Sequence, residues 1–183
     1  MLIAQQKLNE NIAEYILYMY QVEDVIRAYQ FDVEAIIENY VRPQLPDESF
    51  IGQYRKWYSD LITQMKSQQL TKTGHIADLK EIFVELSYLH NTLINLTGDH
   101  KYKDLVERST SFIEEFRSKS NLKDKNQIEL LFGAMYMKLL LKLQKKEISA
   151  ETEEAFDAMR IQLAYLSQAY HKMKRGDLDF LKN

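Results

Sequence analysis

Apolar side chains recur every three or four residues along most of this chain, which is the spacing of one face of an α-helix. A clear case runs through Phe50, Tyr54, Trp57, Leu61 and Met65. The 183 residues include only 5 Gly and 2 Pro, so few positions favour tight turns or interrupt a regular element. No run alternates convincingly between apolar and polar residues, as a half-buried strand does. The pattern therefore predicts long amphipathic helices rather than a sheet.

Capping residues mark the ends of several of these helices. Asn11 and Glu14 have the spacing of a capping box, in which the side chain of each residue accepts a hydrogen bond from the backbone N–H of the other. Asp124 and Gln127 repeat that spacing before the segment 127–143. Gly176 follows a run of basic residues, as expected just after the end of a helix.

The connections between the periodic segments are short, which favours antiparallel neighbours. We therefore expect an all-α fold, a single-domain antiparallel bundle of six to seven helices over residues 1–183. The segment around 130–143 is apolar nearly all round and is expected to be its central buried helix. Near the chain end, Phe180 and Leu181 are expected to pack back on the bundle. The expected helices lie close to residues 12–30, 33–42, 50–65, 76–93, 102–116, 127–143 and 150–175.

Composition excludes several classes of function. Cysteine is absent, so a disulfide, a thiolate nucleophile and a Cys-ligated zinc are impossible, and a reducing compartment fits. The formal net charge of −3 argues against a nucleic-acid binder. The chain start lacks the pattern of a signal peptide. The longest apolar-rich stretch, 130–143, is interrupted by Lys138 and Lys142 and is shorter than the roughly 20 residues of a membrane span. We expect a cytoplasmic protein that binds neither nucleic acid nor a membrane.

The segment “ILYMYQVEDVIRA”, residues 16–28, combines apolar and charged residues within one predicted helix. At 100° per residue, Glu23 falls at the edge of the apolar face and Arg27 lies one turn further on, whereas Gln21 and Asp24 fall on the solvent side. Glu23 and Arg27 have the favoured order for an intrahelical ion pair. Either they satisfy each other, or Glu23 faces a pocket in which apolar surroundings would raise its pKa for acid–base work.

His90 is the second candidate, because it falls on the apolar face of the predicted helix 76–93. It is either a ligand contact or a neutral core histidine bonded to a tyrosine or a carbonyl. The candidate ligand-binding residues are Glu23, Arg27, His90 and Tyr20, with no catalytic residue assigned. No histidine has a glutamate three residues before it, so we expect no carboxylate-bridged metal site. Phosphate-binding loops are absent as well, and we expect no cofactor.

Two functions remain open at this point. Several apolar residues lie outside the main stripes, which favours a non-enzymatic protein that acts through protein–protein contacts, as a homodimer. The alternative is an enzyme or a small-molecule-binding protein with an interior pocket lined by Glu, Arg, His and Tyr. That alternative requires Glu23, Arg27 and His90 to converge on one cavity. The residues outside the stripes are Leu17, Tyr18, Tyr20, Val25, Leu130, Met137 and Leu141.

A family resemblance rests on the segment “NIAEYILYMYQVEDVIRAYQFD”, residues 11–32, together with the chain length and the helical pattern. The chain resembles an uncharacterised helical family from Bacteroides-type bacteria, catalogued only as a domain of unknown function. The resemblance covers nearly the whole chain. It implies an all-helical fold, and it implies no activity, cofactor or residue role.

Overall fold

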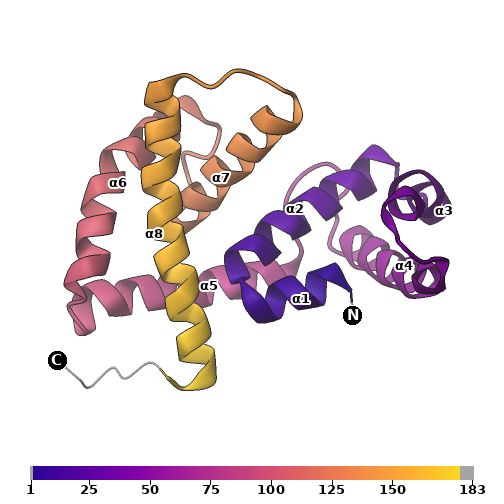
Figure 1. Ribbon diagram of the computed structural model, residues 1–183, viewed down its shortest axis with the longest axis horizontal. Helices are drawn as coiled ribbons and strands as arrows, with labels where there is room; N and C mark the ends of the chain where they lie inside the picture. The colour runs from indigo at the N-terminus through magenta and orange to yellow at the C-terminus, as the bar shows by residue number, and fades with distance from the viewer. Residues whose placement is uncertain (1, 178–183) are drawn as a thin grey trace.

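The computed structural model describes residues 2–177, so Phe180 and Leu181 lie outside the described part of the chain (Figure 1). Within residues 2–177 the fold is all-α, as predicted, with no strand and with eight α-helices rather than six to seven. The α-helices are α1 (Ile3–Glu10), α2 (Ile12–Ala28), α3 (Val33–Ile36), α4 (Ile51–Ser67), α5 (Ala77–Asn91), α6 (His100–Lys119), α7 (Gln127–Leu143) and α8 (Ala150–Arg175). Four short turns of π- or 3₁₀-helix are η1 (Ile37–Val41), η2 (Arg42–Gln44), η3 (Glu48–Phe50) and η4 (Thr92–Leu96).

Helix α1 is an element that the sequence analysis did not predict. It has eight residues, which is too short for a three-to-four periodicity to stand out. Asn11 separates it from α2 with an extended backbone, and the Asn11 side chain accepts hydrogen bonds from the backbone N–H groups of Ala13 and Glu14. The predicted start of α2 is therefore confirmed.

The predicted capping box before α7 was placed two residues too early. Asn126, not Asp124, caps α7, and its partner is Glu129 rather than Gln127. The two pairs have the same spacing, so the sequence alone does not show which pair forms the capping box. At the other end of the chain Gly176 ends α8 with a φ of +75°, as expected for a glycine at that position.

The eight helices form two parts that share one core. In Figure 1, α1 to α4 make up one side of the molecule and α5 to α8 the other. Helices α6 and α8 lie side by side and run antiparallel, with α7 packed against both. Helix α5 crosses α8 at a steep angle, so the described helices do not all run up and down along one axis.

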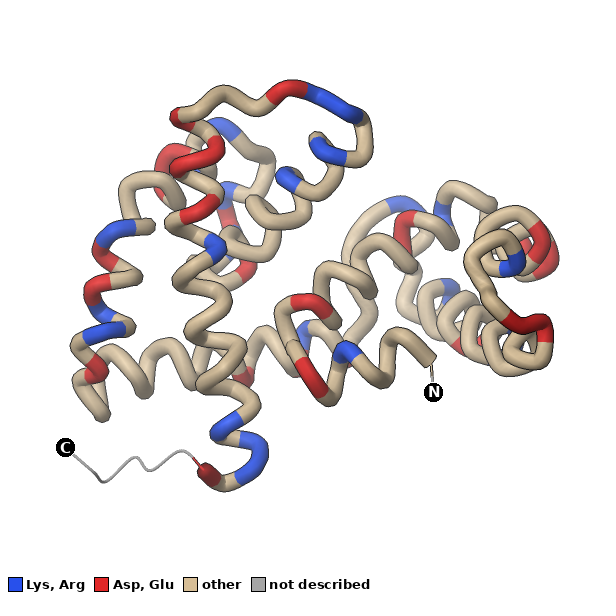
Figure 2. The backbone as a smooth tube through the Cα atoms, in the orientation of Figure 1, with Lys and Arg blue, Asp and Glu red and all other residues tan. Residues whose placement is uncertain are grey.

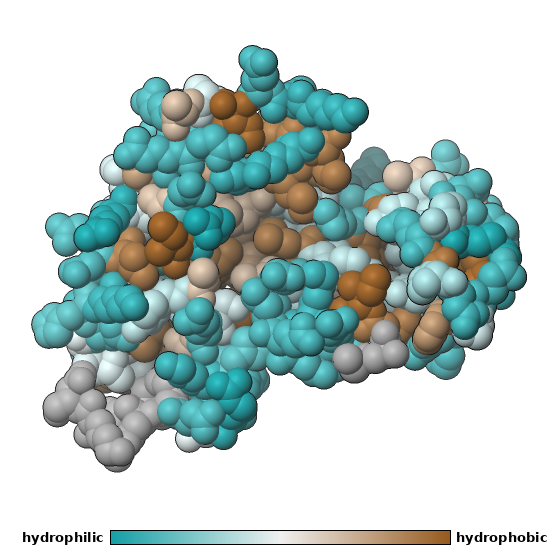
Figure 3. Space-filling view, in the orientation of Figure 1, coloured by the Kyte–Doolittle hydropathy of each residue, from teal (hydrophilic) through white to brown (hydrophobic). Residues whose placement is uncertain are grey.

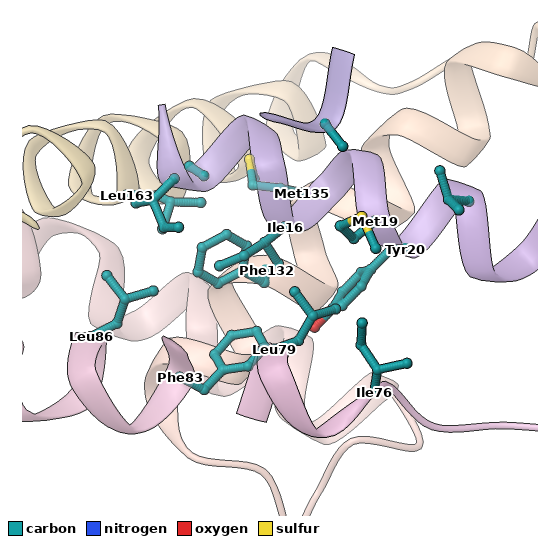
Figure 4. Packing of buried hydrophobic residues seen from close by; sticks show 14 of the residues in the cluster. Ile16, Met19, Tyr20, Ile76, Leu79, Phe83, Leu86, Phe132, Met135 and Leu163 are labelled. Atoms are coloured by element: carbon teal, nitrogen blue, oxygen red, sulfur yellow. The ribbon is translucent and has the colours of Figure 1, made fainter. Parts of the chain in front are cut away.

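The core runs without a break from one part to the other. Ile16 of α2, Phe83 of α5, Phe132 of α7 and Leu163 of α8 meet at its centre (Figure 4). The rings of Phe83 and Phe132 pack edge to face with their centroids 5.2 Å apart, a favourable aromatic geometry. Helix α2 is therefore the element that joins α1–α4 to α5–α8.

The expectation that residues 130–143 form a central buried helix is correct for only half of α7. Buried residues of α7 extend from Ile128 to Met135. Beyond them Met137 is 44% exposed and Leu143 is 65% exposed. Figure 1 shows the end of α7 diverging from α8, and Figure 3 shows apolar residues beside the hollow there. An all-round apolar pattern buries a helix only as far as its neighbours extend.

Charged residues of both signs are interspersed on the surface. Figure 2 shows acidic and basic residues alternating along α6. Helix α8 begins with Glu151 and Glu153 and ends with Lys172, Lys174 and Arg175, which matches the direction of its dipole. Among the helices of residues 2–177, none is both long enough and apolar enough to cross a bilayer.

Candidate functional site

Glu23 of α2 is a buried carboxylate that holds the segment preceding α5. Its side chain is 1% exposed. One oxygen lies 2.5 Å from Nδ1 of His75, and the other accepts the backbone N–H of Ile76 at 2.9 Å. Because a carboxylate only accepts, Nδ1 of His75 is the nitrogen that carries the proton. Each carboxylate oxygen of Glu23 thus has a hydrogen-bond partner, which offsets the cost of burying the charge.

Two tyrosines pack around this pair. The ring of Tyr20 stacks on His75, with centroids 3.7 Å apart and planes 10° apart, and meets the edge of Tyr136. The Tyr136 hydroxyl donates to Asp24 at 2.5 Å. Burial, with a smaller effect of the Glu23 carboxylate, raises the pKa of Tyr20, so this phenol stays protonated. Figure 4 shows Tyr20 at the edge of the core near Ile76.

The predicted ion pair between Glu23 and Arg27 does not form. Arg27 pairs with Asp24 at 2.9 Å instead, so Asp24 is exposed as expected but is the partner of Arg27. The Arg27 guanidinium also donates to the backbone carbonyls of Leu70 (3.2 Å) and Gly74. The spacing of Glu23 and Arg27 within α2 permits an ion pair between them. Each side chain instead bonds the segment that precedes α5.

Glu23 and Arg27 together hold the loop between α4 and α5, residues 68–76, against α2. The loop turns at Gly74, whose φ is +93°. A Cβ atom there would lie 3.0 Å from Leu70, so glycine suits both the backbone and the close contact. Chemically, Glu23, His75 and Arg27 form a structural latch between helix and loop.

His75 is the member of this cluster that the sequence analysis did not select. It lies in a connecting loop, where no periodicity predicts what a side chain will meet. Its position next to a glycine and two residues before the start of α5 was the available signal. A carboxylate–imidazole pair is an arrangement that enzymes use for a general base, with the second nitrogen of the ring toward substrate. The His75 side chain is 37% exposed, so its outer edge reaches solvent.

His90 is a core histidine. It is buried on α5, and its Nδ1 lies 2.8 Å from the hydroxyl of Tyr102 on α6. Burial lowers the pKa of His90, so the ring is neutral near pH 7 and its Nδ1 accepts a hydrogen bond from the Tyr102 hydroxyl. The tyrosine-bonded interpretation of His90 is the one that this geometry supports.

The four candidate residues do not lie in one group. Tyr20 and Glu23 lie close together around His75, and Arg27 of α2 bonds the loop that contains His75. His90 is about 20 Å away at the other end of α5, given the helical rise per residue. Two pockets open at the surface, of about 290 Å³ and about 310 Å³. Neither is lined by Tyr20, Glu23, Arg27 or His90. These two pockets therefore do not supply the shared site that the alternative function requires.

The pocket of about 310 Å³ lies where α2 begins against α8. His171 lines it, and its Nε2 accepts the backbone N–H of Ile12 at 2.9 Å. Ser167 hydrogen-bonds Asn11 there at 2.9 Å. A side chain of α8 thus caps the first turn of α2. Within residues 2–177, no group of three or more His, Cys, Asp or Glu side chains is placed to hold a metal ion.

The family to which the chain belongs follows from a comparison with family models. The model of the domain of unknown function DUF4924 matches residues 1–177. The chain belongs to the DUF4924 family. No curated protein and no solved structure matches the chain. The resemblance to an all-helical family of unknown function is confirmed, and membership of the DUF4924 family assigns no activity and no residue role.

Acidification is expected to destabilise this DUF4924 protein as the pH falls below about 6.5. Burial lowers the pKa of His90 and of His171 below the ordinary value of 6.5. The unfolded chain therefore takes up protons at a higher pH than the folded chain, and stability that is complete above pH 6.5 is lost as the pH falls. For His90 the loss is about 1.4 kcal/mol for each unit by which its pKa is lowered. Urea unfolding at several pH values measures the slope.

The matched variants for this prediction replace one histidine each. His90→Gln and His171→Gln should flatten the dependence of the unfolding free energy on pH. His100→Gln, at an exposed position, should leave it as steep as in the wild-type protein. An unchanged slope in the His90→Gln and His171→Gln variants would contradict the assignment.

Proposed function

We propose that this protein is a non-enzymatic cytoplasmic protein that acts through protein–protein contacts, and that its contact partner is a second copy of the same chain. The single observation that carries the proposal is an apolar face on α5 and η4 that stays exposed among residues 2–177. Val84 is 69% exposed, Tyr88 65% and Leu96 75%. The absence of cysteine fits the cytoplasmic location.

The apolar residues that first motivated a homodimer do not form this face. Tyr20 and Leu130 are buried, and Leu17, Tyr18, Val25 and Leu141 pack against the core. Met137 remains exposed at the end of α7. Intramolecular packing thus absorbs most of the surface on which the sequence argument rested. The support for a contact surface comes from α5 instead.

The outer face of α5 has the composition of a small interface. Val84 and Tyr88 are four residues apart, so their side chains stand on the same side of the helix. Exposed polar residues extend the same face in both directions: Lys80, Glu81, Asn91 and Asn95. Helix α5 and η4 together form a rod about 30 Å long. The face therefore has an apolar centre and a polar rim, the pattern of protein–protein interfaces.

Charge favours an antiparallel pair of α5 helices. If a two-fold axis passes beside Leu86, Val84 of each copy packs on Tyr88 of the other. Glu81 then lies level with the neutral Asn91 of the second copy. A parallel pair would oppose Lys80 to Lys80 and Glu81 to Glu81, and such like-charge contacts are costly. The antiparallel arrangement is also the isologous contact that closes a dimer.

Light scattering or sedimentation tests the dimer directly. The wild-type protein should be a dimer at tens of micromolar, and Tyr88→Glu should be a monomer. Because a central aromatic residue contributes at least about 2 kcal/mol to an interface, its loss should raise the Kd for dimerisation at least 30-fold. The control is Ile161→Glu on α8, an exposed apolar residue outside this face, which should remain dimeric. A monomeric wild-type protein would refute the proposal.

Cross-linking tests the orientation, because the chain has no native cysteine. Single variants Glu81→Cys and Asn91→Cys are treated, separately and mixed, with a short thiol-reactive cross-linker. In the antiparallel pair residue 81 of one copy lies level with residue 91 of the other, while the two copies of residue 81 are about 15 Å apart along the helix axis. Only the mixture should cross-link. Efficient cross-linking of Glu81→Cys alone indicates a parallel pair and contradicts the model.

A further inference from the structure

The pocket of about 290 Å³ lies between α1, α2 and α4, at the start of α5. Its floor consists of buried apolar side chains, Met19, Leu61 and Ile76, and its aromatic walls are Tyr15 and Trp57. The volume is at the lower end of the range of about 300–1,000 Å³ that small-molecule sites occupy. A ligand for this pocket must therefore be small and largely apolar.

The charged side chains that line the pocket are all acidic. Asp60 and Asp78 stand at its rim, and no Lys, Arg or His is among the lining residues. Asp78 accepts one hydrogen bond at Oδ1, from Gln64 at 2.9 Å. Asp60 is paired with the mostly exposed Lys56 at 2.9 Å, a contact that water screens strongly. Both carboxylates therefore retain capacity for a further cation.

The raised pKa of Tyr15 indicates that the electrostatic potential is negative inside the pocket as well. Burial raises the pKa of the Tyr15 hydroxyl, and the carboxylates of Asp78 and Glu23 raise it further. The negative field of these groups thus reaches the inner wall, where the phenol stays neutral. Such a field attracts a cation and repels an anion. The faces of Trp57 and Tyr15 also favour a cation, through their electron-rich rings.

We propose that this pocket binds a small organic cation, an ammonium group on an alkyl or aromatic body. The ammonium lies at the rim between Asp78 and Gln64, which supply oxygen acceptors. The apolar body enters the pocket and packs on Met19 and Trp57. This site is separate from the dimer contact on the outer face of α5, because neither Val84 nor Tyr88 lines the pocket.

Trp57 provides the readout, because it is the single tryptophan of the chain. The full-length protein is titrated at pH 7 with hexylamine, hexanoate and 1-hexanol while Trp57 emission is recorded. Hexylamine should give a saturable change, hexanoate none, and 1-hexanol a midpoint at least tenfold higher. Equal midpoints for the amine and the alcohol would overturn the proposal, as would no saturation with the amine by about 10 mM.

Variants test the polar rim. Asp78→Asn should raise the midpoint for hexylamine at least fivefold, and the exposed Asp104→Asn on α6 should leave it unchanged. Gln64→Lys places a cation beside Asp78, where it competes with the ammonium of the ligand, and should raise the midpoint for hexylamine at least fivefold. Circular dichroism establishes that each variant is folded. An unchanged midpoint for hexylamine in a folded Gln64→Lys variant contradicts the proposed pose.

The same alkyl ammonium occurs in free amines and on lysine side chains, and one further titration separates these sources. Nα-acetyl-lysine methylamide presents the group on a peptide backbone. If the ligand is a free amine, this compound should bind at least tenfold more weakly than hexylamine, because its two amide groups would be buried against the apolar floor of the pocket. Tighter binding of the lysine derivative would overturn the assignment to a free small molecule.

Discussion

Replacing Glu23 with alanine is expected to lower the free energy of unfolding by about 3 kcal/mol, measured by urea denaturation at pH 7. The substitution removes the acceptor for two donors, Nδ1 of His75 and the backbone N–H of Ile76. The Ile76 N–H would be left buried without a partner at the start of α5. The loss should also loosen the loop 68–76, which would then be held against α2 by Arg27 and by the stacking of Tyr20 on His75.

The control for this prediction is Glu14→Ala, on the same helix. Glu14 pairs with Lys7 at 2.7 Å, and its side chain is 57% exposed. Removal of such a surface pair should cost at most about 1 kcal/mol. Because a carboxylate held in strain for function is often removed at no cost in stability, an unchanged or increased stability of Glu23→Ala would contradict the latch and favour a functional Glu23.

Replacing Phe132 with alanine is expected to cost about 3–5 kcal/mol, the range for deletion of a buried aromatic ring. Phe132 is fully buried on α7 and packs edge to face on Phe83 of α5. It lies where α2 meets the other helices, so the cavity would open at the junction of the two parts of the fold (Figure 4). Thermal and urea unfolding both measure the loss.

Met137→Ala, five residues later on α7, is the matched control. The side chain of Met137 is 44% exposed, and its removal should cost less than about 1 kcal/mol. Similar losses for the two variants would show that the packing at the two ends of α7 does not differ as the structure describes. A loss of less than about 1 kcal/mol for Phe132→Ala would show that the shared core is not well packed there.

Much of the secondary structure follows from local sequence. The stripe from Tyr54 to Met65 lies on one buried face of α4, and Asn11 and Gly176 mark a helix start and a helix end as predicted. These features depend on neighbours within four residues, so the chain displays them directly. Local pattern was insufficient for α1, which is too short to show a period, and for the choice between Asp124 and Asn126 as a cap.

The candidate site was predictable only in part. The burial of Glu23 and His90 follows from their place on apolar helix faces, and both are buried. Their partners, however, come from segments distant in the chain. Glu23 meets His75 across 52 positions of sequence, and Tyr136 reaches Asp24 across 112. No periodicity within α2 predicts either contact, because each depends on how the loop 68–76 and α7 pack against that helix.

The sequence by itself determined that this chain is an all-α protein without cysteine chemistry, since composition and periodicity are properties of short segments. Only the tertiary structure decided that Arg27 bonds Asp24 and the loop rather than Glu23, and that Glu23 of α2 contacts the start of α5 while His90 lies at its other end. It likewise decided that α5, and not α2, presents the exposed apolar face. The physical reason is the same in each case: burial and pairing depend on which neighbours pack against a side chain, and a single helix does not contain that information.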